Sequence, residues 1–221
     1  LIATRKSQLD RVEDSLKTLV SISAKKYDKA SPAQAELYMQ QAYFLARNTD
    51  KIKYADQIQE STFKPVLIKE KSDAFPKTYQ WYNQLAYTKE MLDRYQEALN
   101  LLQESEKYII KNYGTKDIQL ATNLEKQAAV LLKKGELTQA EGAIKKAVEI
   151  YKSHSGKVHA ADKANVYIVL SKLYLTLGQY DEAEKALAIA AKLNRRSAKS
   201  KYDKVKSTDE LAGVYISEGR Y

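Results

Sequence analysis

The sequence predicts an all-α protein, built as a solenoid in which antiparallel helix pairs follow one another. Its 221 residues include only seven Gly and three Pro, so the residues that end helices and form the turns of β proteins are scarce. Apolar residues recur at spacings of three and four, which is the period of a helix with one buried face. A short motif also returns about every 42 residues, which is typical of stacked repeats.

The repeating motif consists of a turn residue, an aromatic residue or leucine two positions later, and an alanine three positions after that. Its clearest copies are Gly178, Tyr180 and Ala183; Gly135, Leu137 and Ala140; and Asp93, Tyr95 and Ala98. The alanines lie 42 and 43 residues apart, and a fainter copy places Ala55 another 43 residues before Ala98. Five of the seven glycines fall at two recurring turn positions. This period predicts units of two antiparallel helices.

The motif residues have different expected roles within a unit. Gly178 is expected to adopt a positive φ at the turn, where a Cβ would be penalised. Ala183 is expected to let the two helix backbones approach closely, and Tyr180 to pack against the neighbouring turn. The tyrosines that this pattern places in the core are Tyr95, Tyr167, Tyr174 and Tyr180.

Further positions recur in register with the motif. One unit carries Tyr167, Leu170, Ser171, Tyr174, Gly178, Tyr180, Ala183, Leu187 and Ala190, and weaker copies carry Leu124, Ala128, Leu131, Gly135, Ala140, Ile144 and Ala147, then Tyr82, Leu85, Ala86, Tyr95 and Ala98. These residues resemble the tetratricopeptide repeat. The usual repeat has about 34 residues, whereas the longer period resembles the repeats of kinesin light chains and of many bacterial arrays. The resemblance implies a right-handed superhelical α-solenoid of antiparallel helix pairs.

We expect six segments along the chain. They are an N-terminal helix over 1–31, a degenerate repeat over 32–73, repeats over 74–115, 116–158 and 159–200, and the first helix of a truncated repeat over 201–221. The N-terminal segment has the apolar stripe expected of the second helix of an earlier repeat, formed by Leu9, Val12, Leu16, Leu19 and Val20. A lone first helix at the other end would expose its apolar side, so we expect further sequence after it.

The composition excludes several classes of protein. No window approaches the roughly 18 successive apolar residues that a membrane-spanning helix needs, and the charged start is unlike a signal peptide. The chain has no cysteine, so disulfides and thiolate metal sites are excluded. Cysteine content does not choose a compartment; a cytoplasmic location is slightly favoured, and an extracytoplasmic one is left open.

The sequence offers no pattern of catalytic or cofactor-binding residues. It has neither a glycine-rich phosphate loop nor the G-x-S-x-G elbow of serine hydrolases. His154 and His159 are spaced by five residues, so they do not share one helix face, and no carboxylate cluster completes a zinc site. We therefore expect no enzyme activity, no cofactor and no bound metal.

The resemblance implies a binding surface on the concave side, built by the first helix of each unit. The residues expected on this surface are Asn83, Tyr87, Glu90, Glu125, Lys133, Ile168, Lys172, Leu175 and Asp209. The alternative for each residue is that it only packs the edge of the groove. Many 42-residue repeats hold a peptide backbone with paired asparagines, of which only Asn83 is present here. The tyrosines expected to be freer to contact a partner are Tyr87, Tyr113, Tyr151 and Tyr202.

Positive charge is concentrated near the end of the chain. The net charge is +9, and one stretch of fifteen residues holds seven basic residues and one acidic residue: Lys192, Arg195, Arg196, Lys199, Lys201, Lys204 and Lys206. A solvated helix end is the simpler interpretation, and a site for nucleic acid or an anionic surface is the alternative. The stretch lacks the interleaved aromatic residues of a platform that stacks bases, which argues against nucleic acid as the main partner.

These observations favour a non-catalytic scaffold that binds a protein or peptide partner, with the concave groove as its binding surface. One alternative is a regulatory array within a larger protein that controls a fused effector. A second alternative is a basic solenoid that binds nucleic acid or an anionic surface.

Overall fold

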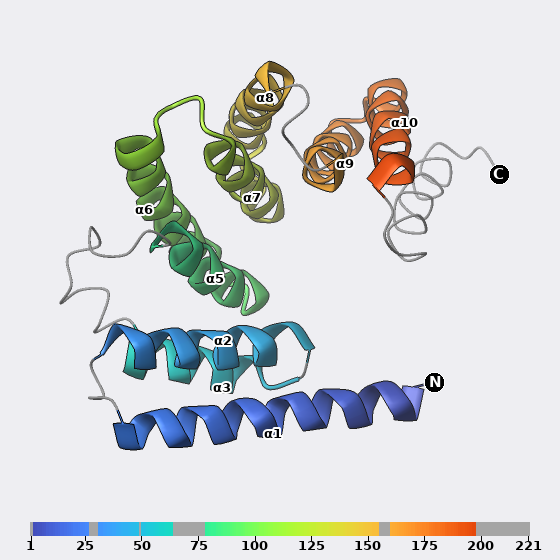
Figure 1. Ribbon diagram of the computed structural model, residues 1–221. Coiled ribbons are helices and arrows are strands. Elements are labelled where there is room, and N and C mark those ends of the chain that lie inside the picture. Colours follow the sequence, from blue (N-terminus) through green and yellow to red (C-terminus); the bar gives the residue numbers. More distant parts are fainter. Residues whose placement is uncertain (1, 27–30, 49, 64–77, 155–159, 198–221) are drawn as a thin grey trace. The chain divides into compact units, whose positions relative to one another are not determined.

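The computed structural model describes residues 2–26, 31–48, 50–63, 78–154 and 160–197 (Figure 1). Within these ranges the secondary structure is helical and contains no strand, which confirms the all-α prediction. The elements in chain order are α1 (Ile2–Lys26), α2 (Pro32–Asn48), α3 (Ile52–Ile58), the π-helix η1 (Gln59–Phe63), α5 (Thr78–Met91), α6 (Tyr95–Tyr113), α7 (Ile118–Lys134), α8 (Leu137–Ser153), α9 (Ala160–Thr176) and α10 (Tyr180–Ser197).

The chain divides into two compact units. Unit 1 comprises Leu1–Tyr108 and unit 2 comprises Ile109–Tyr221, so the boundary falls within α6. Each helix pair of the repeat has a first and a second member. We call α2, α5, α7 and α9 the first helices, and α3 with η1, α6, α8 and α10 the second helices.

Unit 1 is built around α2. Helices α1, α3, η1 and α5 all pack against it, and α1, α2 and α3 lie side by side (Figure 1). One apolar cluster joins α2 to α5 through Ala35, Met39, Trp81 and Leu85, and Leu101 of α6 packs against it. The Ser105 hydroxyl of α6 also donates to the Tyr79 carbonyl oxygen of α5 at 3.1 Å.

Unit 2 contains two helix pairs of the same design. Helix α7 packs against α8, α9 packs against α10, and contacts of α8 and α7 with α9 join the pairs. The core of the second pair consists of Ala164 and Ile168 from α9 and of Ala183, Leu187 and Ala190 from α10. Ala183 is fully buried, as expected for the residue that lets the two helices approach.

Three tight turns connect the helices of a pair, and all three share one geometry. The turn residue has a positive φ, 84° at Gly135, 70° at Gly178 and 58° at Asp93. After α9, the Gln179 N–H donates to the Tyr174 carbonyl at 2.8 Å and the Gly178 N–H to the Leu175 carbonyl at 3.1 Å. The other two turns repeat both bonds. This pattern satisfies carbonyl groups at the helix end, and it confirms the positive φ expected at Gly178.

Two predictions about tyrosines are wrong. Tyr180, the first residue of α10, is 38% exposed, so it does not belong to the core. Tyr151, which was expected to be free for a partner, is only 4% exposed, and its hydroxyl lies 2.9 Å from that of Thr122. Burial raises the pKa of Tyr151 to about 12. Tyr167 and Tyr174 do pack against the α9–α10 core, as expected.

Candidate functional site

In unit 1 the first helices α2 and α5 present an aromatic–arginine cluster, which consists of Tyr43, Arg47 and Tyr87. The rings of Tyr43 and Tyr87 meet edge to face, with centroids 5.9 Å apart and planes inclined at 71°. The Arg47 guanidinium carbon lies 5.4 Å from the centre of the Tyr43 ring and 6.0 Å from that of the Tyr87 ring. The cluster therefore places a cation against two aromatic faces, within the distance at which cation–π attraction operates.

Local sequence explains why these side chains meet. Tyr43 and Arg47 are four residues apart on α2 and thus lie on one helix face. The Arg47 Nη1 donates to the Tyr43 hydroxyl oxygen at 3.0 Å, which fixes the guanidinium over the ring. Arg47 remains exposed and both tyrosines are half-buried. An arginine has five N–H donors, so this geometry leaves donors to face a ligand.

A polar contact extends the same α2–α5 face toward the start of both helices. The indole N–H of Trp81, a residue that is 5% exposed, donates to the carboxylate of Glu36. The other oxygen of Glu36 accepts a hydrogen bond of 2.8 Å from the Gln40 side chain. Since both bonds hold one carboxylate, the face has a fixed arrangement of polar groups.

The residues predicted for the groove in unit 1 all lie on α5. Tyr87 belongs to the aromatic–arginine cluster and also packs against the core between α2 and α3. Asn83 and Glu90 are half-buried on the same helix. The predicted site and the observed cluster therefore share one residue, Tyr87.

The residues predicted for the groove in unit 2 divide between surface and core. Lys133 of α7 and Lys172 of α9 are exposed, and Glu125 is half-buried. Ile168 is only 3% exposed and belongs to the α9–α10 core, and Leu175 packs against that core. For Ile168 the alternative interpretation holds, in which the residue only packs, because a side chain buried against the second helix offers no surface to a ligand.

The remaining predicted residues fall mostly outside the described ranges. Lys192 is exposed on α10, and Arg195 and Arg196 lie in the last turn of that helix. The residues beyond the described part of the chain are Lys199, Lys201, Lys204, Lys206 and Asp209. Tyr202 and His159 lie outside it as well.

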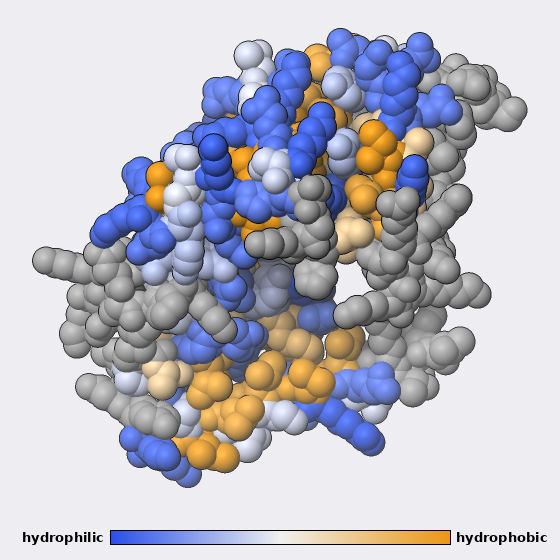
Figure 2. All heavy atoms as spheres, turned by 45° about the horizontal axis from the view of Figure 1, so that its top comes forward, coloured by the Kyte–Doolittle hydropathy of each residue, from blue (hydrophilic) through white to orange (hydrophobic). Residues whose placement is uncertain are grey.

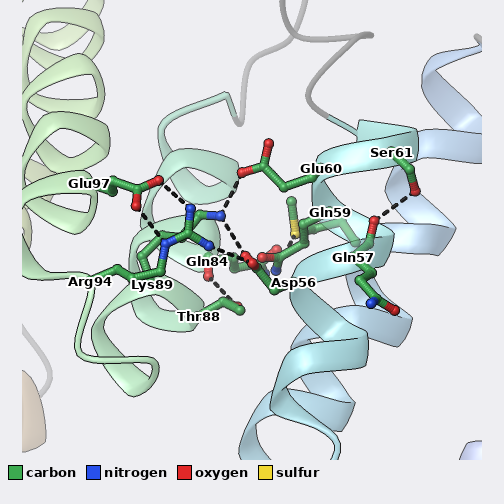
Figure 3. Close-up of polar contacts among 11 residues, drawn as sticks. Asp56, Gln57, Gln59, Glu60, Ser61, Gln84, Thr88, Lys89, Arg94 and Glu97 are labelled. Atoms are coloured by element: carbon green, nitrogen blue, oxygen red, sulfur yellow. Dashed lines mark hydrogen bonds and ion pairs between the residues drawn. The ribbon is translucent and has the colours of Figure 1, made fainter.

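A buried ion-pair network fixes α5 against α3 and η1 (Figure 3). Lys89 of α5 has a side chain that is only 3% exposed, and its Nζ lies 2.5 Å from Asp56 Oδ1 and 2.6 Å from Glu60 Oε1. Arg94 extends the network, with its Nη1 2.7 Å from Asp56 Oδ2. Both oxygens of Glu97 accept hydrogen bonds from Arg94, at 2.5 and 2.6 Å. A buried ammonium is tolerated only when it is paired in this way.

A cavity of about 180 Å³ adjoins the network, and its lining consists of Glu60, Leu85, Lys89, Glu97, Asn100 and Leu101. Two leucines give it an apolar side. Its carboxylates and its ammonium already neutralise one another or Arg94. We therefore assign the network the role of positioning α5, and we assign no ligand to the cavity.

Two carboxylates of unit 1 depend on their cationic partners for their ionised state. Hydrogen bonds from Arg94 lower the pKa of Glu97, and hydrogen bonds from Lys17 and Lys51 lower the pKa of Glu13. A lowered folded-state pKa means that these carboxylates stabilise the fold above their ordinary pKa. That stabilisation is lost as the pH falls through the folded-state value.

Sequence reasoning missed Tyr43, Arg47 and the buried Lys89. A signal for the first two was present, since an aromatic residue and an arginine spaced by four occur in a helical pattern. Lys89 offered no such signal, because a lysine within an amphipathic helix is usually exposed. Its partners Asp56 and Glu60 lie 33 and 29 residues earlier in the chain.

A metal site or a membrane-spanning helix would each bear on function, and the described residues show neither. The described ranges hold no group of three or more His, Asp or Glu side chains placed to bind a metal ion. His154, at the end of α8, directs its Nδ1 to the Ile150 carbonyl at 2.9 Å. Among these same residues, no helix combines the length and the apolar character needed to span a membrane.

A comparison of the sequence with models of protein families agrees with the helical fold and its repeated turns. Residues 77–153 and 120–196 match the tetratricopeptide repeat, and together the two matches cover more than half of the chain. The chain therefore belongs to the tetratricopeptide repeat family. Repeats of this family generally mediate protein–protein interaction and are generally non-catalytic.

Solved structures of similar fold agree with this assignment. BtubC (BKLC) from P. vanneervenii is 19% identical over 96% of this chain and 85% of that chain, with a TM-score of 0.72. A putative kinesin light chain with nearly identical TPR-like repeats from Podosopora anserina is 18% identical over 86% and 89% of the two chains, with a TM-score of 0.66. MamA from Desulfovibrio magneticus RS-1 is 19% identical over 87% and 97%, with a TM-score of 0.50. No curated protein sequence matches the chain significantly.

Proposed function

We propose that the chain is a non-catalytic scaffold that binds a peptide or a partner helix along its first helices. The observation that carries this proposal is the aromatic–arginine cluster of Tyr43, Arg47 and Tyr87, which α2 and α5 hold in a fixed geometry. Tyrosine and arginine are enriched among the residues that dominate binding energy at protein interfaces.

The chemistry of the cluster suits a carboxylate or a backbone carbonyl of the partner. The guanidinium presents planar donors that pair with two acceptor atoms at once. The tyrosine rings add apolar area at low entropic cost, because each has few rotatable bonds. In unit 2 the exposed Lys133 and Lys172 supply positive charge on first helices. We therefore expect a partner segment that carries acidic side chains.

The proposal is tested by recovery of partners with the intact protein and with three variants. Arg47→Ala tests unit 1, and Lys133→Glu with Lys172→Glu tests unit 2. Lys185→Glu is the matched control, because Lys185 is a lysine on a second helix whose side chain is 75% exposed. We expect the same partner to be lost with the first-helix variants and kept with the control. Recovery that is unchanged in every variant would remove the support for first-helix binding.

Salt dependence separates this function from binding to an anionic polymer. A protein that neutralises six or more phosphates loses roughly a thousandfold or more in affinity between about 50 and 200 mM salt. A protein partner bound through aromatic contacts and a few charges is expected to show a much shallower dependence. A steep slope together with loss of binding on nuclease treatment would contradict the proposal.

A further inference from the structure

Helix α2 carries two charges of opposite sign in one row along its surface. The row consists of Glu36, Gln40, Tyr43 and Arg47, whose spacings of three and four place them on one helix face. We call it the α2 row. Glu36 and Arg47 are its two ends, and they lie about 16 Å apart along the helix axis at 1.5 Å per residue. Arg47 is exposed and Glu36 is half-buried.

Both charges are held in position, but neither is neutralised. The Glu36 carboxylate accepts hydrogen bonds from the Trp81 indole N–H and from the Gln40 side chain. Arg47 donates to the Tyr43 hydroxyl at 3.0 Å and lies over two tyrosine rings. Within the described part of the chain, neither Glu36 nor Arg47 forms an ion pair. Because their partners are neutral, each charge is left to attract an opposite charge on another molecule.

We propose that the α2 row binds a helix of the partner protein that carries one basic and one acidic side chain about 11 residues apart. The basic side chain pairs with Glu36 and the acidic side chain with Arg47. This inference rests on the proposed function, and it adds the conformation of the bound segment and the spacing of its charges. A segment with the wrong sign at either position meets a fixed like charge, so the two ends of the row discriminate between partners.

The distance between the charges favours a helix over an extended peptide. An extended chain rises about 3.3 Å per residue, so it covers this distance in about five residues. Side chains five residues apart on an extended chain point to opposite faces, so only one of the two charges would face α2. A helix covers the same distance in about 11 residues, which is close to three full turns, so both of its charges return to one face.

Apolar contacts do not fix where along α2 the partner docks. Figure 2 shows that hydrophobic side chains gather over the N-terminal helices on the face it presents. Apolar attraction is non-directional, so it tolerates a partner that slides along the surface. Sliding by one turn, about 5.4 Å, would move both charges away from Glu36 and Arg47. The two ion pairs therefore set the register of the bound helix.

The experiment selects ligands of the full chain from a displayed library of helical peptides of about 20 residues, in which the positions of one face are randomised. Selected sequences are expected to be enriched in one acidic and one basic residue about 11 positions apart, with no enrichment of such pairs about four or seven positions apart. A second library has proline in the middle of each peptide, which prevents a continuous helix. Binders from the proline library alone would overturn the proposal.

Variants of the chain are then tested with the most enriched peptide by fluorescence anisotropy. Glu36→Gln keeps an acceptor for the Trp81 indole and removes the charge, so it is expected to weaken binding about threefold. Glu36→Lys is expected to weaken binding about tenfold. Changing the basic residue of the peptide to glutamate is expected to restore binding to Glu36→Lys. The matched control is Glu149→Lys, at an exposed residue of the second helix α8, which should leave binding unchanged. Circular dichroism verifies that each variant is folded.

Failure of this inference is distinguishable from failure of the proposed function. A peptide that is lost with Arg47→Ala but binds equally to Glu36→Lys, Glu36→Gln and the unaltered chain would overturn the charge pair and leave the proposed function in place. A peptide that is insensitive to Arg47→Ala as well, or a library without binders, would contradict both. A second copy of α2 carries the same two charges at the same spacing, so a dimer in sedimentation that Glu36→Lys dissociates would also overturn the proposal.

Discussion

Unit 1 and unit 2 contain helix pairs of similar design, but they are stabilised by different interactions. In unit 1 some of the ion pairs involve buried side chains: the exposed fraction of the side chain is 3% for Lys89, 7% for Glu13 and 14% for Asp56. In the ion pairs described for unit 2, both side chains are at least 31% exposed. Both units bury alanine at the recurring positions: Ala55 and Ala98 in unit 1, and Ala140, Ala147, Ala183 and Ala190 in unit 2, are fully buried.

This difference explains why the repeat is clear in one part of the sequence and faint in the other. An alanine that lets two helices approach can be used in every unit, so it leaves a periodic mark. A buried lysine needs carboxylates at particular positions of other helices, so it occurs where those partners exist and leaves no period. The family match covers residues 77–196 and does not extend to α2 and α3.

The largest effect is expected from removing the buried ammonium of unit 1. Lys89→Ala leaves Asp56 and Glu60 without their closest cation, and breaking a buried pair in this way is expected to cost about 3–4 kcal/mol. Hydrogen exchange should show loss of protection in α3 and α5, whereas α9 and α10 should change little.

The matched control for this prediction is Lys145→Ala on α8. Lys145 pairs with Glu141 at 2.5 Å, but its side chain is 59% exposed. Solvent-exposed ion pairs contribute little, so this variant should leave protection in both units unchanged. Equal loss of protection in the two variants would mean that burial of the charge does not distinguish unit 1 from unit 2.

The next largest effect is expected from overfilling the core of unit 2. Ala183 is fully buried between α9 and α10, so Ala183→Trp must separate the helices or distort their side chains. We expect a cost of about 2–3 kcal/mol, visible as a lower melting temperature and as faster exchange in α9 and α10. A variant that melts at the wild-type temperature would contradict the role of Ala183 as the spacer of the pair.

The sequence predicted the parts of the molecule that depend on local chemistry. The pairs of unit 2 and the turn at Gly178 follow from helix period and from glycine's freedom at positive φ. The sequence could not predict Lys89, because its burial depends on side chains that only the folded chain brings together. Tyr43, Arg47 and Tyr87 are an intermediate case. The first two are close in sequence, but their contact with Tyr87 depends on how α5 packs against α2.

The smallest effect concerns the shared turn, where unit 2 uses glycine and unit 1 uses aspartate. Gly178 has φ 70°, and a Cβ added there meets no atom within 4 Å, so Gly178→Ala tests backbone strain alone. Strain of this kind costs roughly 1–2 kcal/mol. Asp93 adopts φ 58° in unit 1 and accepts a hydrogen bond of 2.6 Å from the Tyr95 hydroxyl.

Aspartate tolerates this conformation better than alanine does. Asp93→Gly is expected to change the free energy of unfolding by less than about 0.5 kcal/mol, because relief of the remaining backbone strain offsets the lost hydrogen bond. Asp93→Ala removes the hydrogen bond and keeps a Cβ, so it should destabilise the chain as Gly178→Ala does. Chemical denaturation of the four proteins measures these differences. If Asp93→Ala were as stable as Asp93→Gly, a Cβ at positive φ would carry no cost at this turn, which would contradict the prediction.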